Sequence, residues 1–302
     1  MKLSRDAKEI IKTIVFVLIV AALIIAYAVY PLSRTKAYYG RTGIDDFNAD
    51  TTLFNNDSLW VAAGLIPDTF KVEADGWVTL AGLYLEPDSV AQDSIPGTVL
   101  LVHGDDGTRD DMRLLAQVFA DSDYVVIAYD QRASGASTGK YTGEGGLEAT
   151  DMEALVGHLE LRQQIAHPLA VVGYGLGGDA ALLAAQEDSR IDQVVAVDPH
   201  LSTKRFMDRL RQRHDGYWFP LYRMIMWFWY NIRSSYGEPF RKAGDIDAVA
   251  CPTVVLLPED AMDIDEVTAL RELSDPQMLR LLPLSDGDEA VFRAVFEFAP
   301  GP

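Results

Sequence analysis

The chain has 302 residues, is 49% hydrophobic and carries a formal net charge of −19. This length and apolar content suit one large α/β domain or two smaller ones. The excess of acidic residues argues against a nucleic-acid partner, because one polyanion repels another. The single cysteine, Cys251, precedes an apolar run, which predicts a buried structural thiol and excludes an intrachain disulfide.

An apolar segment lies near the N-terminus. Within residues 10–30 no charged residue occurs from Ile14 to Tyr30, and a helix needs about 20 residues to cross the hydrocarbon of a bilayer. The run is long for a signal-peptide core and no clear cleavage site follows, so we expect an uncleaved single-pass anchor behind a tail of residues 1–9. Basic residues flank the run on both sides, and the short tail favours a globular domain on the extracytoplasmic side.

A polar, turn-rich stretch follows the anchor. Residues 31–58 are predicted to form a tether, and residues 59–302 a folded domain. This domain should open with a hairpin of strands Phe70–Ala74 and Trp77–Leu85, joined at Asp75-Gly76.

Short apolar strands then alternate with helices. The predicted strands are Thr98–Val102, Tyr124–Ala128, Ala170–Val172, Val194–Val197, Thr253–Leu257 and Met278–Leu282. The predicted helices lie near residues 110–121, 148–165, 178–187, 204–234, 264–274 and 288–298. This alternation predicts an α/β fold with a mostly parallel sheet that is covered by helices on both faces.

The interval 204–240 differs from its surroundings in its aromatic content. Its closely spaced aromatic residues include Trp218, Phe219, Trp227, Phe228, Trp229 and Tyr230. One interpretation is a cap helix that is buried on the core. The other is an amphipathic surface that contacts lipid or a protein partner. A nearby membrane anchor allows both interpretations together.

A glycine-rich loop follows the strand Ala170–Val172. Gly173, Gly175 and Gly178 match G-x-G-x-x-G, the pattern of a dinucleotide-binding loop, and Asp198 stands where a ribose-binding acid would be expected. The same loop fits the nucleophile elbow G-x-S-x-G, with glycine at the serine position. Chain order disfavours the dinucleotide, because such a loop normally follows the first strand of its sheet and several strands precede this one.

Two further motifs flank this loop in the chain. The sequence HGDDGTRDDM spans residues 103–112, directly after a strand, and YDQRASGAST spans residues 129–138, after the next strand. From about Val72 to Phe298 the chain resembles the α/β-hydrolase superfamily, in particular the membrane-anchored and lid-bearing serine hydrolases. These carry H-G-x-x-G, D-x-R-G-x-G-x-S and G-x-S-x-G in the same order.

The resemblance implies an α/β-hydrolase fold with an eight-stranded sheet and a helical cap inserted at about 204–240. It places the degenerate elbow at Gly173, Gly175 and Gly177, where Gly175 has no side chain that could attack a carbonyl. The oxyanion-like and pocket positions are His103, Gly104 and Leu176.

The sequence also has no clear match to the catalytic base and the catalytic acid of such enzymes. No histidine follows the last predicted strand, so none is expected within reach of the elbow, and the vestigial acid loop offers only Asp260 and Asp263. Substitutes for the missing groups are few. They are Ser134, Ser137 and His103, with Asp179 inside the helix after the elbow and His200 as a residue that could line the pocket.

The sequence therefore predicts a catalytically inactive, membrane-anchored α/β-hydrolase homologue that acts by binding. It would be a partner subunit of a membrane complex, or a sensor of a small molecule or lipid. No cofactor is expected, and the acidic loops lack the convergent ligands of a metal site. An active esterase or peptidase with a non-standard nucleophile is the alternative, and a nicotinamide or flavin oxidoreductase is a third interpretation.

Overall fold

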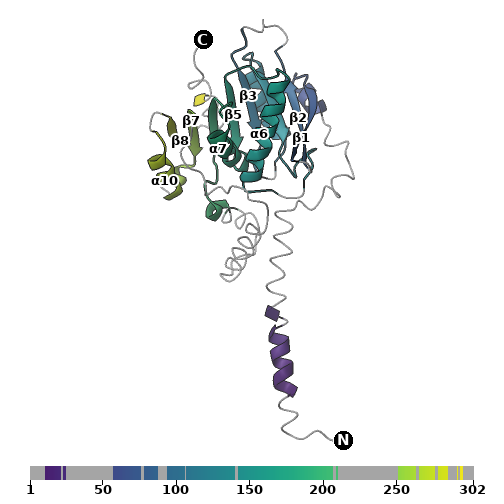
Figure 1. Cartoon of the computed structure of the whole chain (residues 1–302), viewed down its shortest axis with the longest axis vertical. Coiled ribbons are helices and arrows are strands. Elements are labelled where there is room, and N and C mark those ends of the chain that lie inside the picture. The colour runs from purple at the N-terminus through teal and green to yellow at the C-terminus, as the bar shows by residue number, and fades with distance from the viewer. Residues whose placement is uncertain are drawn as a thin grey trace. The chain divides into compact units, whose positions relative to one another are not determined.

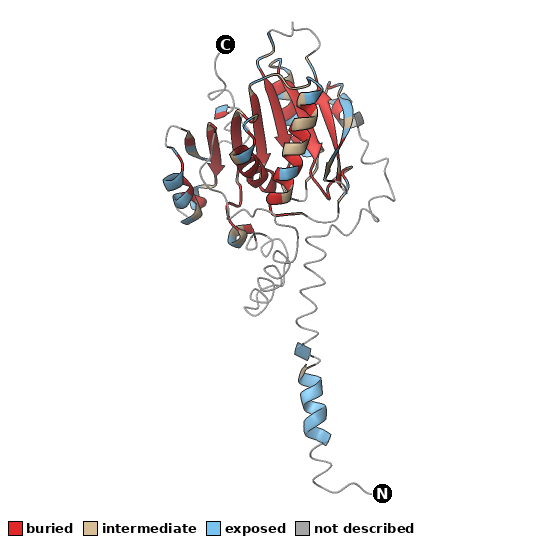
Figure 2. Cartoon of the chain, viewed as in Figure 1, coloured by how far each residue is buried: buried red, intermediate tan, exposed pale blue. Residues whose placement is uncertain are grey.

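The computed structural model divides the chain into two compact units, Met1–Gly40 with His214–Pro239, and Arg41–Arg213 with Phe240–Pro302. The described residues are 11–21, 23–24, 57–75, 78–87, 94–105, 107–139, 142–206, 209, 251–262, 265–275, 278–284, 291 and 293–294. In the first unit, residues 11–21 and 23–24 are helical and expose most of their apolar side chains (Figure 2). Nowhere among these ranges is a helix both long and apolar enough to cross a membrane, and residues 10, 22 and 25–30 of the predicted anchor lie outside them.

The second unit alternates strands with helices (Figure 1). Its strands are β1 (Asp68–Asp75), β2 (Val78–Leu85), β3 (Thr98–Val102), β4 (Val125–Asp130), β5 (Leu169–Tyr174), β6 (Gln193–Val197), β7 (Thr253–Leu257) and β8 (Leu279–Pro283). Its helices are α4 (Asp57–Ala62), α5 (Arg113–Ala120), α6 (Gly146–Leu161), α7 (Leu176–Glu187) and α10 (Asp265–Leu273), with short 3-10 helices η3 (Arg109–Met112) and η5 (Glu259–Ala261).

The strands form one eight-stranded sheet in the order β1-β2-β4-β3-β5-β6-β7-β8. β1 pairs antiparallel with β2, and β2 antiparallel with β4, while all other pairs are parallel. The predicted, mostly parallel sheet is thus confirmed. Because β3, β5 and β6 are parallel neighbours, the loops that follow their carboxyl ends meet at one edge of the sheet.

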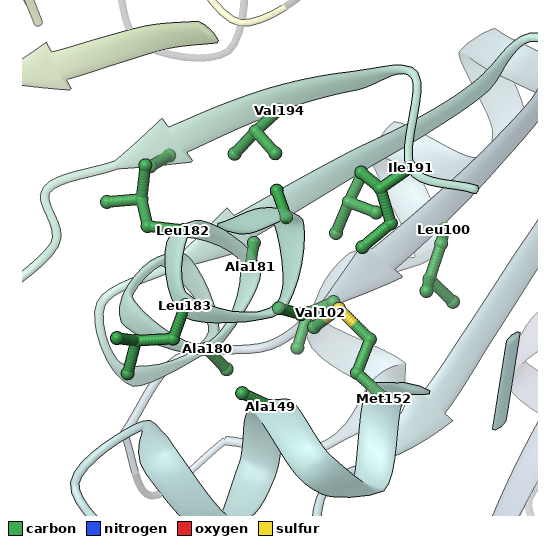
Figure 3. Packing of buried hydrophobic residues seen from close by; sticks show 14 of the residues in the cluster. Leu100, Val102, Ala149, Met152, Ala180, Ala181, Leu182, Leu183, Ile191 and Val194 are labelled. Carbon is green, nitrogen blue, oxygen red and sulfur yellow. The ribbon is translucent and has the colours of Figure 1, made fainter. Parts of the chain in front are cut away.

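The strands β2 to β7 are buried on both faces, as their apolar sequences predict, whereas the edge strands β1 and β8 are mostly exposed or half-buried. Leu100 and Val102 of β3 belong to a core cluster with α6, α7 and α10, whereas Val99 and Leu101 belong to a second cluster with α4 and α5. Figure 3 shows the first cluster, in which the alanines of α7 lie between the sheet and α6. Small side chains let this helix approach the strands closely and fix the position of its first turn.

Two helices differ from the sequence-based expectation. α6 ends at Leu161 instead of near residue 165, because Gln163 adopts φ +58° and turns the chain away. α4 begins inside the predicted tether, and its Trp60 is fully buried, with the indole N–H donating to Asp110 Oδ1 at 2.7 Å. The tryptophan packs this helix onto the sheet, a contact that a turn-rich local sequence does not indicate.

Candidate functional site

The chain turns sharply between β5 and α7. Gly175, between these elements, has φ +48° and ψ −116°, a conformation that L side chains rarely adopt. Its N–H donates to the Val197 carbonyl at 2.9 Å, and its own carbonyl accepts from the Asp179 N–H at 3.1 Å. The strand-to-helix turn of a nucleophile elbow is present, with no side chain at its apex.

Close backbone packing accounts for the two glycines that flank the apex. A Cβ on Gly173 would lie 2.2 Å from the Gly177 carbonyl oxygen, and a Cβ on Gly177 would lie 2.6 Å from the His103 carbonyl oxygen. Since real Cβ atoms essentially never come within 3.0 Å of another heavy atom, both positions require glycine. The elbow therefore packs directly against the loop after β3.

His103, the first residue of that loop, has both ring nitrogens engaged. The backbone N–H of Gln131 donates to His103 Nε2 at 2.9 Å, so Nε2 carries no proton. The ring hydrogen is then on Nδ1, which donates to the Gly104 carbonyl at 2.8 Å. His103 thus fixes the shape of the loop around Gly104, and its ring does not offer a general base.

Asp105, two residues further on, fills the space over the elbow. A Cβ built on Gly175 would lie 2.7 Å from Asp105 Oδ2 and 3.7 Å from the Asp105 backbone nitrogen. The same carboxylate oxygen lies 3.4 Å from Nε2 of His200. A carboxylate from the loop after β3 therefore occupies the place into which an elbow side chain would extend.

His200 comes from the loop after β6 and is held by Asp179 of α7. His200 Nδ1 lies 2.6 Å from Asp179 Oδ2, and the same carboxylate accepts the backbone N–H groups of His200 at 3.1 Å and Leu201 at 2.9 Å. The imidazole also packs edge-on against Phe206, with ring centroids 5.1 Å apart. The side chains of Asp179 and His200 are 0% and 1% exposed, whereas that of Asp105 keeps 11%.

These contacts form a chain Asp105–His200–Asp179, which we call the elbow cluster. Burial alone would lower the pKa of His200, but the charge of Asp179 and the hydrogen bonds to Asp105 and Asp179 outweigh it and raise the pKa to about 9. The imidazole is therefore an imidazolium at neutral pH. In this state it can donate a proton but cannot accept one.

The expectation that no histidine reaches the elbow is wrong. Two backbone conformations with positive φ, at Asp198 (+49°) and Leu201 (+62°), fold the loop after β6 so that His200 reaches Asp179. The sequence held one signal for this site. Asp179 is the only charged residue among the buried positions of α7, and a buried carboxylate needs a partner.

The hydroxyl of Ser137 has a backbone role. It donates to the Asp130 carbonyl and accepts the Ala81 N–H at 2.8 Å, which ties the loop after β4 to β2. Ser134 is buried in the same loop and is 8% exposed. This loop is built as a structural turn.

The remaining candidates lie away from the elbow cluster or outside the described residues. Asp198, the predicted ribose-binding acid, is paired with Arg205 and Arg209. Asp260 is exposed in η5. Asp263 and the aromatic residues from 218 to 230 lie outside the described residues. In the described part of the chain, no group of three or more histidine, cysteine or acidic residues is arranged to hold a metal ion.

One protein-family model and several solved structures are similar to this chain. Residues 93–234 match the family described as "Serine aminopeptidase, S33". An esterase of Pyrococcus furiosus, Pf2001, superposes with a TM-score of 0.59 at 20% identity, covering 79% of this chain and 93% of its own. No curated protein sequence matches the chain.

Two further solved structures share the fold. A serine hydrolase homologue from Coxiella burnetii has a TM-score of 0.53 at 15% identity, over 77% of this chain and 97% of its own. A membrane phospholipase A, described as a bacterial virulence factor, has a TM-score of 0.53 at 16% identity, over 98% of this chain and 100% of its own. At these identities the likeness concerns the fold.

Proposed function

We propose that this chain, which has the α/β-hydrolase fold and matches the S33 family model over residues 93–234, is a superfamily member without serine-hydrolase activity, which acts by binding at its elbow while it is anchored to a membrane. One observation carries this proposal. The elbow residue is Gly175, and the Asp105 carboxylate takes the space of the missing side chain. No hydroxyl at this point can form an acyl-enzyme.

The charge state of the cluster supports the same conclusion. Serine hydrolysis needs a neutral histidine that removes the proton from the nucleophile. His200 is instead protonated at neutral pH, since it faces a carboxylate on each side. The resting site is an ion pair and not an activated nucleophile.

Binding remains possible because the backbone of the elbow is intact. The N-terminus of α7, a helix of 12 residues, begins directly after Gly175, and helix N-termini present N–H groups to polar ligands. The backbone nitrogen of Asp105 lies 3.7 Å from the apex position. A ligand carbonyl that displaces the Asp105 carboxylate could therefore be held here without being cleaved.

The membrane part of the proposal rests on the apolar segment 10–30. Its described residues form a helix whose large apolar side chains are exposed, which suits a lipid environment. We place the globular domain on the extracytoplasmic side. The aromatic segment from Trp218 to Tyr230 is proposed as a surface for lipid or for a protein partner in a membrane complex.

Fluorophosphonate labelling tests the absence of serine chemistry. The full-length protein in mild detergent is treated with a fluorophosphonate beside an active serine hydrolase, and the intact mass of each is read. We expect an adduct on the active enzyme alone. An adduct mapped to any serine of this chain would refute the proposal.

Copurification tests the binding role. The tagged full-length chain is extracted from membranes in gentle detergent, and its mass and bound molecules are measured. A stable partner or a retained small molecule is expected. A bare monomer with nothing attached would contradict the binding role and leave the labelling result unaffected.

A further inference from the structure

The Asp105 carboxylate covers the apex of the elbow and contacts the ring of His200. Its Oδ2 lies 2.7 Å from the position of a Cβ on Gly175 and 3.4 Å from His200 Nε2. A ligand that reaches the backbone of the elbow therefore has to displace this carboxylate. We infer that Asp105 is an autoinhibitory gate over the elbow, which is held closed by the proton on His200 Nε2 and is released when that proton is lost.

The number of hydrogens on the imidazole decides whether both of its carboxylate contacts are attractive. As an imidazolium, His200 offers the Nδ1 hydrogen to Asp179 and the Nε2 hydrogen to Asp105. A neutral imidazole has one N–H, so one of its nitrogens then presents a lone pair to a carboxylate. Because two acceptors with no hydrogen between them repel each other, one of the two contacts has to open.

The contact with Asp105 is the one that opens. The distance from His200 Nδ1 to Asp179 is 2.6 Å, against 3.4 Å from Nε2 to Asp105, so the remaining hydrogen is held more strongly on Nδ1. Asp179 also accepts the backbone N–H groups of His200 and Leu201, and its side chain is 0% exposed. The side chain of Asp105 keeps 11% exposure, so it is the carboxylate that can turn toward water.

The other charged groups around this loop are engaged with different partners. Asp198, at the start of the loop that carries His200, is paired with Arg205 and Arg209. On the side of α10, the carboxylate of Glu266 accepts a hydrogen bond from the same loop. Among the described residues, the charges in direct contact with the imidazole are therefore the two carboxylates of the elbow cluster.

The pH at which the gate opens follows from the same contacts. Burial lowers the pKa of His200, whereas the charge of Asp179 and the hydrogen bonds to Asp105 and Asp179 raise it, and the result is a pKa of about 9. The stability that these contacts contribute is full below the ordinary histidine pKa of 6.5 and is lost as the pH rises through about 9. The gate is therefore closed in a neutral medium and opens in an alkaline one.

The substitution Asp105→Asn tests the gate through the sign of its effect. The full-length protein and the variant are unfolded with denaturant in one mild detergent, at about pH 6.5 and about pH 10.5. At the lower pH the variant should raise the unfolding equilibrium constant by about 2- to 150-fold, because it loses an ion pair. At the higher pH the variant should be as stable as the unaltered protein or more so, since an amide N–H can donate to the neutral Nε2 and a carboxylate cannot. An equal loss at both pH values would overturn the inference.

Hydrogen exchange at neutral pH locates the movement. His200→Gln removes the charge of the imidazole, so the backbone N–H groups of the loop after β3 should exchange faster by a factor in the same range, while those of β7 keep their rates. His158→Gln makes the same change in the last turn of α6 and should leave the loop unaffected. Equal exchange of the loop in the two variants would overturn the inference. If His200→Gln accelerates exchange throughout the unit, the sign change at Asp105 decides by itself.

This inference rests on the proposed function and adds a control on ligand access to the elbow, and the outcomes keep the two apart. A fluorophosphonate adduct on a serine would refute the proposed function and leave the sign change at Asp105 untouched. A loss for Asp105→Asn that does not depend on pH would remove the gate, and the labelling and copurification results would still stand for the proposed function.

Discussion

A serine at position 175 would restore the nucleophile of the family motif, but we expect it to strain the elbow. The substitution places an L residue at φ +48° and ψ −116°, at a cost of about 1–3 kcal/mol. Its Cβ would lie 2.7 Å from Asp105 Oδ2, below the 3.0 Å that real Cβ atoms keep, so the carboxylate must shift. For a unit of this size the strain alone lowers Tm by about 2–12 °C, at about 2–4 °C per kcal/mol.

Three further variants separate the strain from the contact. Gly64→Ser puts serine at φ +83° where no atom lies within 4 Å of its Cβ, so it reports backbone strain only. Gly175→Ser should lower the free energy of unfolding by more than Gly64→Ser does. The double variant Gly175→Ser with Asp105→Ala should lower it by less than the sum of the two single changes, with a coupling of about 0.5–3 kcal/mol. Thermal unfolding followed by circular dichroism in one detergent gives all four values.

The same variants report on reactivity. With Asp105 removed, His200 loses one of its two carboxylates in the cluster, its pKa falls, and a serine at 175 has a histidine–aspartate pair beside it. The double variant should therefore react with a fluorophosphonate, whereas Gly175→Ser alone should not. The conclusion that Asp105 fills the apex would be refuted by two results together. The stability losses of Gly175→Ser and Asp105→Ala would add in the double variant, and Gly175→Ser alone would react with the fluorophosphonate.

Three other predictions concern the scaffold. Arg132→Ala should cost about 3–5 kcal/mol in denaturant unfolding, because it leaves the Asp151 carboxylate buried without the guanidinium that now donates to both its oxygens at 2.7 Å and 2.6 Å. Gly173→Ala should cost at least about 1–3 kcal/mol, since its Cβ would meet a backbone carbonyl oxygen at 2.2 Å. Hydrogen bonding to Asp192 raises the pKa of His167, so the stability difference between the protein and His167→Gln should be full below pH 6.5 and vanish as the pH rises through the raised pKa. Because the His167 side chain is 46% exposed, this difference should stay below about 1 kcal/mol.

Each of these has a contrary result. A loss below about 1 kcal/mol for Arg132→Ala would mean that the ion pair is not desolvated. An unchanged melting temperature for Gly173→Ala would mean that α7 can move away from β5. A difference at His167 that grows with pH would have the wrong sign for a histidine whose pKa is raised.

Local patterns predicted the sheet well. Strands such as β3 and β7 are continuous apolar runs, and a buried parallel strand leaves that signature because both of its faces pack. The elbow was also visible, because Gly173 and Gly177 are required by close contacts with backbone atoms and Gly175 by its φ of +48°. The sequence predicts such features because they depend mainly on the residues of the segment in which they occur.

The elbow cluster was not visible for a physical reason. Its three side chains come from loops after β3 and β6 and from α7, and their meeting depends on strand order and on two left-handed loop residues. The family motif places the catalytic histidine after the last strand, where this sequence has no histidine. Asp179, a charge on a buried helix face, was the one local sign that a partner had to exist.

The origin of the cluster has a consequence for the mechanics of the sheet. In the family layout the base and the acid follow the last strands, so any opening of that edge dismantles the active site. Here the cluster is drawn from the centre of the sheet, from residues that follow β3, β5 and β6. β8, whose residues after Leu279 are exposed or half-buried, contributes no residue to the cluster and is separated from β6 by β7. A change in β8 therefore moves no residue of the elbow cluster directly, whereas a change in β7 would reach it, because the Asp198 N–H in the loop that carries His200 donates to the Leu256 carbonyl of β7 at 2.7 Å.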